Sequence, residues 1–191
     1  AVLFLTLVHL FWMTGVHGNN MLEPVAQSLY VPGIAENAAR IAQGLQPEHL
    51  LTKTFFDTFV FMGGCGSTLC LVLAILIVAR KRNLRRHARF SLLPVLFNVN
   101  ELIVFGLPII FNPIYLIPFI LVPVLLMFIA AGATAAGLVP YTVHATEWTT
   151  PILLGGYAAT GSLAGSVLQL VNLAVGILCY APFVIISDMQ I

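Results

Sequence analysis

One carboxylate in an apolar stretch, Glu101, is the residue of this sequence best suited to chemistry. It lies in the run 90–112, directly after two amides, Asn98 and Asn100. An ionised carboxylate in a bilayer costs several kcal/mol, so such residues are usually paired, face a cavity and serve a function. We therefore expect Glu101 to work in a polar cavity. The two amides either bind hydroxyl groups of a ligand or satisfy broken backbone around the carboxylate, and the sequence leaves both possibilities open.

His17 is the second candidate group. It lies between Gly15 and Gly18, and Asn19 continues the polar junction. The glycines allow the backbone to approach a ligand closely or to adopt unusual dihedral angles. A histidine at a helix end is often structural, but His17 opens a broken, polar region and is therefore a candidate site residue. His9, which has apolar neighbours on both sides, is expected to be structural.

A third group of candidates is the sequence Trp148, Thr149 and Thr150, which precedes Pro151. It places an amphipathic ring and two hydroxyls just before the expected start of a helix. The tryptophan is either an anchor at the membrane interface or a surface on which a ligand ring stacks.

Other kinds of site find no support in the sequence. It has no glycine-rich phosphate loop with a lysine, no cluster of metal ligands and no G-x-S-x-G elbow. We therefore expect no cofactor and no metal. The three cysteines, Cys65, Cys70 and Cys179, lie in apolar stretches and are expected to be reduced and buried.

The composition indicates the kind of protein in which these candidate groups lie. Of the 191 residues, 60% are hydrophobic and 8% charged, and the mean hydropathy is +1.01. Soluble domains carry about 25% charged residues, so a soluble fold, a disordered chain, a nucleic-acid-binding protein and a disulfide scaffold are all excluded. A transmembrane helix needs roughly 20 residues, which allows about four to six spans. We expect an all-α polytopic membrane protein forming one domain.

The apolar segments divide into clear spans and broken elements. Residues 1–16, 59–79 and 113–139 are expected to form spans, whereas 151–186 is too long for one straight helix and predicts one span plus a shorter half-helix. Residues 17–57 and 90–112 are interrupted by polar residues and by prolines, Pro108 among them. We interpret them as two re-entrant helical hairpins, because non-helical backbone at membrane depth must face protein or a water-filled cavity.

The first broken element contains several charges whose partners are open. Glu23 either lines a cavity or pairs with Arg40 or Lys53. Breaks are expected at residues 31–33 and 45–47. Two broken elements flanking a span are typical of the binding sites of transporters.

Basic residues are concentrated directly after the span 59–79. Six of the eight Lys and Arg of the chain lie within residues 80–89. The positive-inside rule therefore predicts that 80–89 is a cytoplasmic loop. Binding of anionic lipid or of an acidic partner there is the alternative.

The stretch 97–113, FNVNELIVFGLPIIFNP, closely resembles the signature of the membrane-embedded IIC component of the bacterial phosphoenolpyruvate-dependent sugar phosphotransferase system, in the lactose, cellobiose and diacetylchitobiose branch. Residues 11–19 and 148–161 resemble two further motifs of that family, in the same order. The family commonly has proline where this chain has Leu102. The resemblance covers nearly the whole chain, which begins without Met and inside an apolar run, so we expect a fragment, 1–191, that forms the C-terminal, substrate-binding half.

The resemblance implies an enzyme, a sugar phosphotransferase, in the bacterial cytoplasmic (inner) membrane. A β-linked disaccharide would bind between the hairpins, and a phosphocysteine of the phosphorylated cytoplasmic IIB component would phosphorylate its 6-hydroxyl. Glu101 would act as general base, and His17 would orient the hydroxyl or stabilise charge. The full-length protein would be a homodimer in the lipid bilayer, without nucleic acid. The sugar would contact Asn19, Asn98, Asn100, Trp148, Thr149 and Thr150.

Two other functions remain open. In an ion-coupled secondary sugar transporter, Glu101 and His17 would be proton sites and the sugar would enter unmodified. In a non-catalytic membrane sensor, the fold would persist without the chemistry.

Overall fold

The structure, a computed structural model, describes residues 1–107 and 109–190. This part of the chain contains helices and no strand, which confirms the expected all-α class. The first half comprises α1 (Val2–Met13), α2 (Gly18–Leu29), α3 (Pro32–Ala42), α4 (Lys53–Phe55), the π-helical turn η1 (Phe56–Val60), the 3-10 turn η2 (Cys65–Ser67) and α5 (Thr68–Val78). The second half comprises α6 (Arg82–Leu96), α7 (Glu101–Gly106), α8 (Pro113–Ala135), α9 (Leu154–Thr160) and α10 (Leu163–Gln190).

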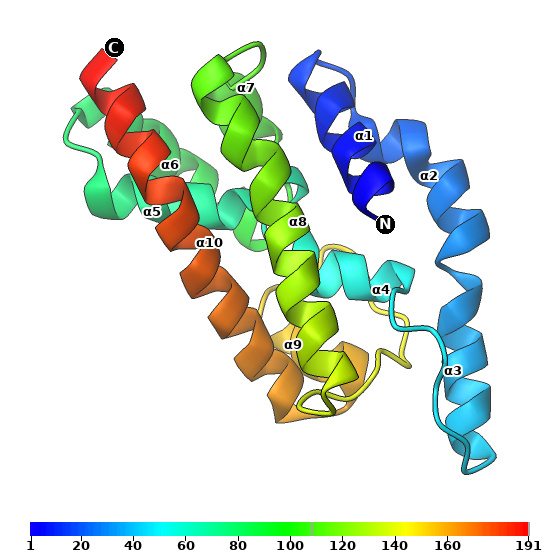
Figure 1. The fold of residues 1–191 in the computed structure, drawn as a ribbon. Coiled ribbons are helices and arrows are strands. Elements are labelled where there is room, and N and C mark those ends of the chain that lie inside the picture. The colour runs from blue at the N-terminus through cyan, green and yellow to red at the C-terminus, as the bar shows by residue number, and fades with distance from the viewer. Residues whose placement is uncertain (108, 191) are drawn as a thin grey trace.

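Helices α8 and α10 run side by side through the molecule, with α5 packed against α10 (Figure 1). The close approach of α5 and α10 depends on Gly176, because a Cβ atom at this position would lie 2.4 Å from the Cys70 Sγ. Helices α2 and α3 form the opposite flank, and α4 leads from that flank into the centre. The core around α4, η1 and α8 is rich in buried aromatic rings, among them Phe56, Phe59 and Phe119.

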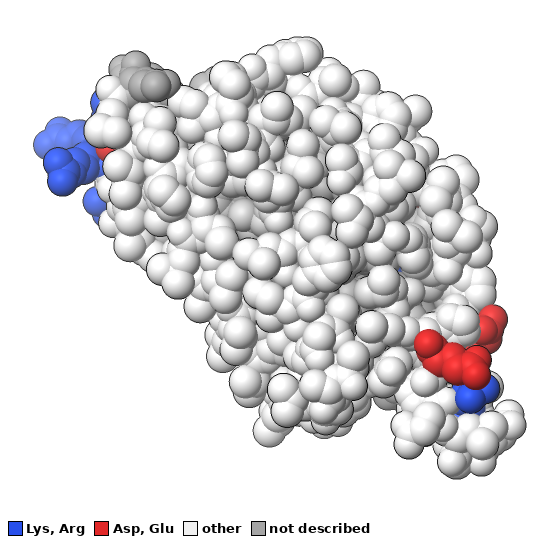
Figure 2. All heavy atoms as spheres, in the orientation of Figure 1, with Lys and Arg blue, Asp and Glu red and all other residues white. Residues whose placement is uncertain are grey.

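Three helical stretches are long and apolar enough to cross a membrane: Lys53–Val78, Pro113–Ala135 and Leu163–Met189. Exposed apolar side chains such as Leu121, Phe128 and Leu178 lie along α8 and α10. In Figure 2 the charged residues gather at two opposite ends of the molecule, and the broad face between them is almost entirely of other types. This distribution suits a membrane protein whose ends reach water on the two sides.

The stretch 59–79 is not the straight span that we expected. Between η1 and α5, Gly63, Gly64 and Gly66 have φ of +82°, +92° and +74°, so the helix is interrupted. Only glycine suits Gly66, because a Cβ atom there would lie 2.2 Å from the ring of Phe119. These glycines form a non-helical break near the start of the stretch.

The break is fixed by two buried side chains from distant helices. The Gly66 N–H donates a hydrogen bond to the Nε2 atom of His9 on α1 (2.8 Å), and the hydroxyl of Tyr180 on α10 donates to the Gly66 carbonyl. The structural role expected of His9 is therefore confirmed, and it consists of satisfying a backbone group that the broken helix leaves free.

Three further expectations have different outcomes. Residues 80–89 are not a loop, because helix α6 begins at Arg82. The segment 151–186 divides as predicted into a short helix, α9, and a long one, α10, with Gly161 in the left-handed region between them (φ +68°). The run 90–112 is broken after Leu96 and resumes at Glu101, while Pro108 lies outside the described residues. The assignment of the two broken regions as re-entrant hairpins stays a prediction.

Candidate functional site

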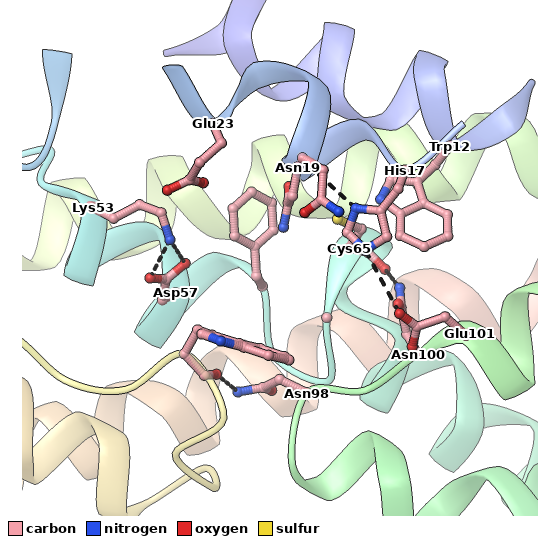
Figure 3. A pocket seen from close by; sticks show the side chains of 14 residues that line it. Trp12, His17, Asn19, Glu23, Lys53, Asp57, Cys65, Asn98, Asn100 and Glu101 are labelled. Atoms are coloured by element: carbon pink, nitrogen blue, oxygen red, sulfur yellow. Dashed lines mark hydrogen bonds and ion pairs between the residues drawn. The ribbon is translucent and has the colours of Figure 1, made fainter. Parts of the chain in front are cut away.

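A cavity of about 420 Å³ lies between the start of α2, the region of α4 and η1, the glycine break and the turn that leads into α7 (Figure 3). This volume falls within the range of roughly 300 to 1,000 Å³ that is typical of small-molecule sites. Five of the expected site residues on these elements and Trp148 line it together. The complete lining is Trp12, His17, Asn19, Asn20, Glu23, Lys53, Asp57, Phe61, Gly64, Cys65, Asn98, Asn100, Glu101 and Trp148.

Glu101 and His17, 84 positions apart in the sequence, meet in this cavity. The Nε2 atom of His17 lies 3.7 Å from a carboxylate oxygen of Glu101, and their side chains are 40% and 48% exposed. Glu101 is the first residue of α7, where a negative charge is favourable because the free N–H groups of the first turn point toward it. The distance exceeds that of a direct hydrogen bond, so both groups remain available to a ligand hydroxyl placed between them.

The orientation of the His17 ring is set by local structure. His17 is the N-cap of α2, and its Nδ1 atom accepts a hydrogen bond from the Asn20 N–H (3.4 Å). Its ring packs on Trp12 with a centroid distance of 4.4 Å. Because the cap requires a lone pair on Nδ1, the neutral ring carries its proton on Nε2, the atom that faces Glu101.

The amide of Asn98 is committed to the protein backbone. Its oxygen accepts from the Gly63 N–H (2.7 Å), and its nitrogen donates to the carbonyl groups of Trp148 (2.5 Å) and Thr150 (3.3 Å). Asn100 donates in the same way to the Cys65 carbonyl (3.0 Å). Of the two roles left open by the sequence, the structure shows that of satisfying broken backbone.

The three candidates at residues 148–150 differ in whether they line the cavity. Trp148 lines the cavity, and its carbonyl accepts a hydrogen bond from the Asn98 amide. Thr149 and Thr150 are not among the described residues that line it, although the Thr150 carbonyl takes part in the network of Asn98. The structure therefore does not bring these two hydroxyls to the cavity.

An ion pair that we did not predict forms the wall opposite Glu101. Lys53 donates to both carboxylate oxygens of Asp57 (2.8 and 2.6 Å), and the two side chains are 23% and 11% exposed. The spacing of four residues within an apolar helical segment was the available signal. We instead considered Lys53 as a partner of Glu23.

Glu23 also lines the cavity, and its pairing with Arg40 or Lys53 is not formed. Its carboxylate accepts a hydrogen bond from Gln27 (2.6 Å). Arg40 pairs with Glu48 at 3.0 Å. The cavity thus contains three carboxylates and one lysine, so it offers several acceptors to a ligand that is rich in hydrogen-bond donors.

The three cysteines are free; Cys65 and Cys70 are buried, whereas Cys179 is only half-buried. Within residues 1–107 and 109–190, His, Cys, Asp and Glu form no group of three or more that could hold a metal ion.

Residues 1–123 match the family model described as "Phosphotransferase system, EIIC". The chain belongs to this family. This confirms the resemblance found in the motifs around residues 17 and 101, and it agrees with a membrane location.

Three comparisons extend the match over the whole chain. The cellobiose-specific EIIC component of Geobacillus stearothermophilus is 42% identical over 100% of this chain and 43% of its own length. The oligo-beta-mannoside-specific EIIC component of Bacillus subtilis is 36% identical over 95% of this chain and 41% of its own length. The crystal structure of the transporter ChbC, the IIC component from the N,N'-diacetylchitobiose-specific phosphotransferase system, is 40% identical with a TM-score of 0.94, covering 99% of this chain and 44% of that one. The chain therefore spans less than half the length of these relatives.

Proposed function

We propose that this chain is the substrate-binding, C-terminal half of an EIIC sugar transporter that takes up a β-linked disaccharide and delivers it to the cytoplasm as a 6-phosphate. The names of the relatives, which refer to cellobiose, oligo-β-mannoside and diacetylchitobiose, support this substrate class. The cavity volume and its mixture of carboxylates, amides and an aromatic ring support a sugar ligand.

The observation that carries the proposal is the convergence of Glu101 and His17 at 3.7 Å in one cavity. A sugar 6-hydroxyl between them donates its proton toward the Glu101 carboxylate, while the His17 Nε2–H donates a hydrogen bond to the same oxygen. Both groups thus hold one nucleophilic oxygen in a fixed direction. Phosphoryl transfer depends mainly on such positioning and on electrostatic stabilisation.

The reaction itself is a substitution at phosphorus. The sugar oxygen attacks the phosphoryl group of a phosphocysteine on the cytoplasmic IIB partner, Glu101 takes the hydroxyl proton, the phosphorus–sulfur bond breaks and the cysteine leaves as a thiolate. The sugar phosphate is charged and does not return through the apolar membrane. In this proposal the full-length protein is a homodimer in the bacterial inner membrane, and residues 80–89 lie on the cytoplasmic side.

The test compares wild type with Glu101→Gln in inverted membrane vesicles from cells that express the gene encoding this chain. The vesicles receive phosphoenolpyruvate, the soluble phosphotransferase proteins and labelled cellobiose. We expect the wild type to form cellobiose 6-phosphate, and Glu101→Gln to bind the sugar within about threefold of wild type but to form at least a hundredfold less product. General-base catalysis typically contributes factors of about 10² to 10⁴.

Glu147→Gln is the matched control, because Glu147 is exposed and does not line the cavity. It should leave product formation unchanged. Sugar that accumulates unmodified and follows a proton gradient would contradict the proposal and indicate an ion-coupled transporter. Uptake that is absent in wild type, with sugar binding retained, would indicate a non-catalytic sensor.

A further inference from the structure

A second cavity, of about 370 Å³, lies at the basic end of the molecule, apart from the sugar site. It is formed where α5 passes into α6, at the end of α7 and at the end of α10. Its lining is Lys81, Arg82, Asn83, Leu84, His87, Gly106, Leu107, Ser187 and Asp188. The proposed transport function does not use this cavity.

The charge around this cavity is strongly positive. Six Lys and Arg lie within residues 80–89, and none of them forms an ion pair with a carboxylate among the described residues. The carboxylate of Asp188 is occupied by the backbone N–H groups of Arg80 (2.7 Å) and Lys81 (3.2 Å). Two cationic side chains in the cavity lining, Lys81 and Arg82, are therefore left for an anion.

Further donors face the same space. Helix α6 begins at Arg82 without a side-chain cap, and such a helix start favours an anion. The buried hydroxyl of Ser187, which lies near that of Tyr115, belongs to the cavity lining. A ligand oxygen in the cavity would satisfy donors that the protein leaves without an acceptor.

The position of the cavity selects the kind of anion. Two membrane-spanning stretches, Lys53–Val78 and Leu163–Met189, end beside it, which places it at the depth of lipid headgroups. The end of α10 beside it also carries exposed apolar side chains, Ile185 and Met189. In Figure 2 the Lys and Arg side chains form the corresponding end of the molecule, and the uncharged face begins next to them.

From this arrangement we propose that the cavity at the start of α6 binds an anionic glycerophospholipid. The lipid phosphate accepts from Lys81, Arg82 and the first N–H groups of α6, and the acyl chains lie along the end of α10. A free phosphate would use the same donors but would gain nothing from the apolar surface beside them. Basic pockets between transmembrane helices are suited to this kind of ligand.

The test measures lipid selectivity of the purified protein. It is incubated with equal amounts of phosphatidylglycerol and phosphatidylcholine that have the same acyl chains, repurified, and its bound lipids are quantified by mass spectrometry. Wild type should be enriched in phosphatidylglycerol. Lys81→Gln/Arg82→Gln should lower this enrichment about tenfold to thirtyfold, because each basic side chain near an anionic headgroup contributes a factor of about five.

Two further variants separate the cavity from general charge. Arg86→Gln/Arg89→Gln removes the same charge from exposed residues of α6 outside the cavity lining and should retain the enrichment within twofold. Gly106→Leu keeps every charge but fills the cavity, and the fold has room for it because a Cβ atom at this position meets only His87, at 3.5 Å. It should lower the enrichment as Lys81→Gln/Arg82→Gln does. It therefore tests the proposal even if that double variant fails to fold.

Three outcomes would overturn the proposal. Equal losses in the two charge-removing pairs would show unspecific attraction, and full enrichment in Gly106→Leu would show that lipid does not enter the cavity. Displacement of phosphatidylglycerol by an equal concentration of inorganic phosphate would show that the site takes a free anion rather than a lipid.

Discussion

The side chain of Asn98 joins three segments that are far apart in the sequence. One amide holds the glycine break through Gly63 and the loop through Trp148 and Thr150. It does so from a residue with φ of +63°, a conformation that asparagine tolerates better than most side chains. The turn that delivers Glu101 to the cavity is therefore fixed by the polar residue that precedes it by three positions.

This role predicts the effect of Asn98→Asp, which keeps the shape of the side chain. The Gly63 N–H keeps an acceptor, but the carbonyl groups of Trp148 and Thr150 lose their donor and face a carboxylate. We expect a loss of about 2 to 4 kcal/mol in unfolding free energy, since each buried group left unsatisfied costs about 1 to 3 kcal/mol. The measurement is denaturant unfolding in detergent. Asn20→Ala, an exposed cavity residue whose side chain has no hydrogen bond in the described part of the chain, should change stability by less than 0.5 kcal/mol.

The ion pair of Lys53 and Asp57 allows a second prediction. Lys53→Met leaves the Asp57 carboxylate without its partner in a largely buried position and should cost about 3 to 5 kcal/mol, whereas Lys53→Met/Asp57→Leu should cost less than the single change. Unfolding midpoints of the two variants in the same detergent decide this. A double variant less stable than the single one would show that the pair itself stabilises the fold.

At the residue scale, the sequence indicated two groups that meet in the candidate site, Glu101 and His17, but not the residues that surround them. Glu101 and His17 were predictable because a carboxylate in an apolar run and a histidine between glycines are unusual whatever their neighbours are. The wall formed by Lys53 and Asp57 was not, because the π-helical turn and the glycine break decide which face of that helix meets the cavity. The sequence left open whether the Asn98 amide binds a ligand or backbone groups, and the structure shows the second.

At the scale of elements, the close contact of α5 and α10 depends on the absence of a side chain at Gly176. Gly176→Ala brings a Cβ atom to 2.4 Å from the Cys70 Sγ and should destabilise the protein by about 1 to 3 kcal/mol, because one of the two helices must move. Gly132→Ala on α8 is the matched change, since nothing lies within 4 Å of its Cβ position. It should be neutral or stabilise by up to about 1 kcal/mol.

Thermal unfolding of both glycine variants in detergent checks this pair. Equal stability of the two would mean that α5 and α10 are not held at the described distance. The sequence does not predict this difference in stability, because Gly132 and Gly176 both lie in apolar helical runs and nothing in the local pattern distinguishes them.

Helix boundaries were predictable where the local amino-acid composition determines them. They were not predictable where contacts with residues distant in the sequence determine the backbone conformation. The division of 151–186 followed from length and from its glycines. The break in 59–79 was missed because its left-handed residues are stabilised by His9 and Tyr180, more than 50 positions away in each direction. The helix α6 was missed because a basic run indicates topology without indicating backbone conformation.

At the scale of the whole molecule, the separation of charge between the two ends predicts sidedness. The end of α3 and the start of α6 lie at opposite ends of the structure (Figures 1 and 2). If residues 80–89 lie in the cytoplasm, as we propose from the positive-inside rule, a membrane-impermeant maleimide should modify Gln43→Cys in intact cells and Arg86→Cys only in inverted vesicles. Both positions are exposed. Wild type controls for the three native cysteines, and modification of both variants from one side would contradict the arrangement.

The N-cap of α2 has a consequence for the part that His17 can take in moving protons. A proton relay through a histidine needs both ring nitrogens to exchange partners, but the Nδ1 atom of His17 is tethered to the Asn20 N–H. A proton arriving there would face another donor, and the Asn20 N–H would lose its acceptor. While this cap is intact, His17 therefore presents Nε2 as a donor beside the Glu101 carboxylate, and its Nδ1 atom is engaged with the backbone.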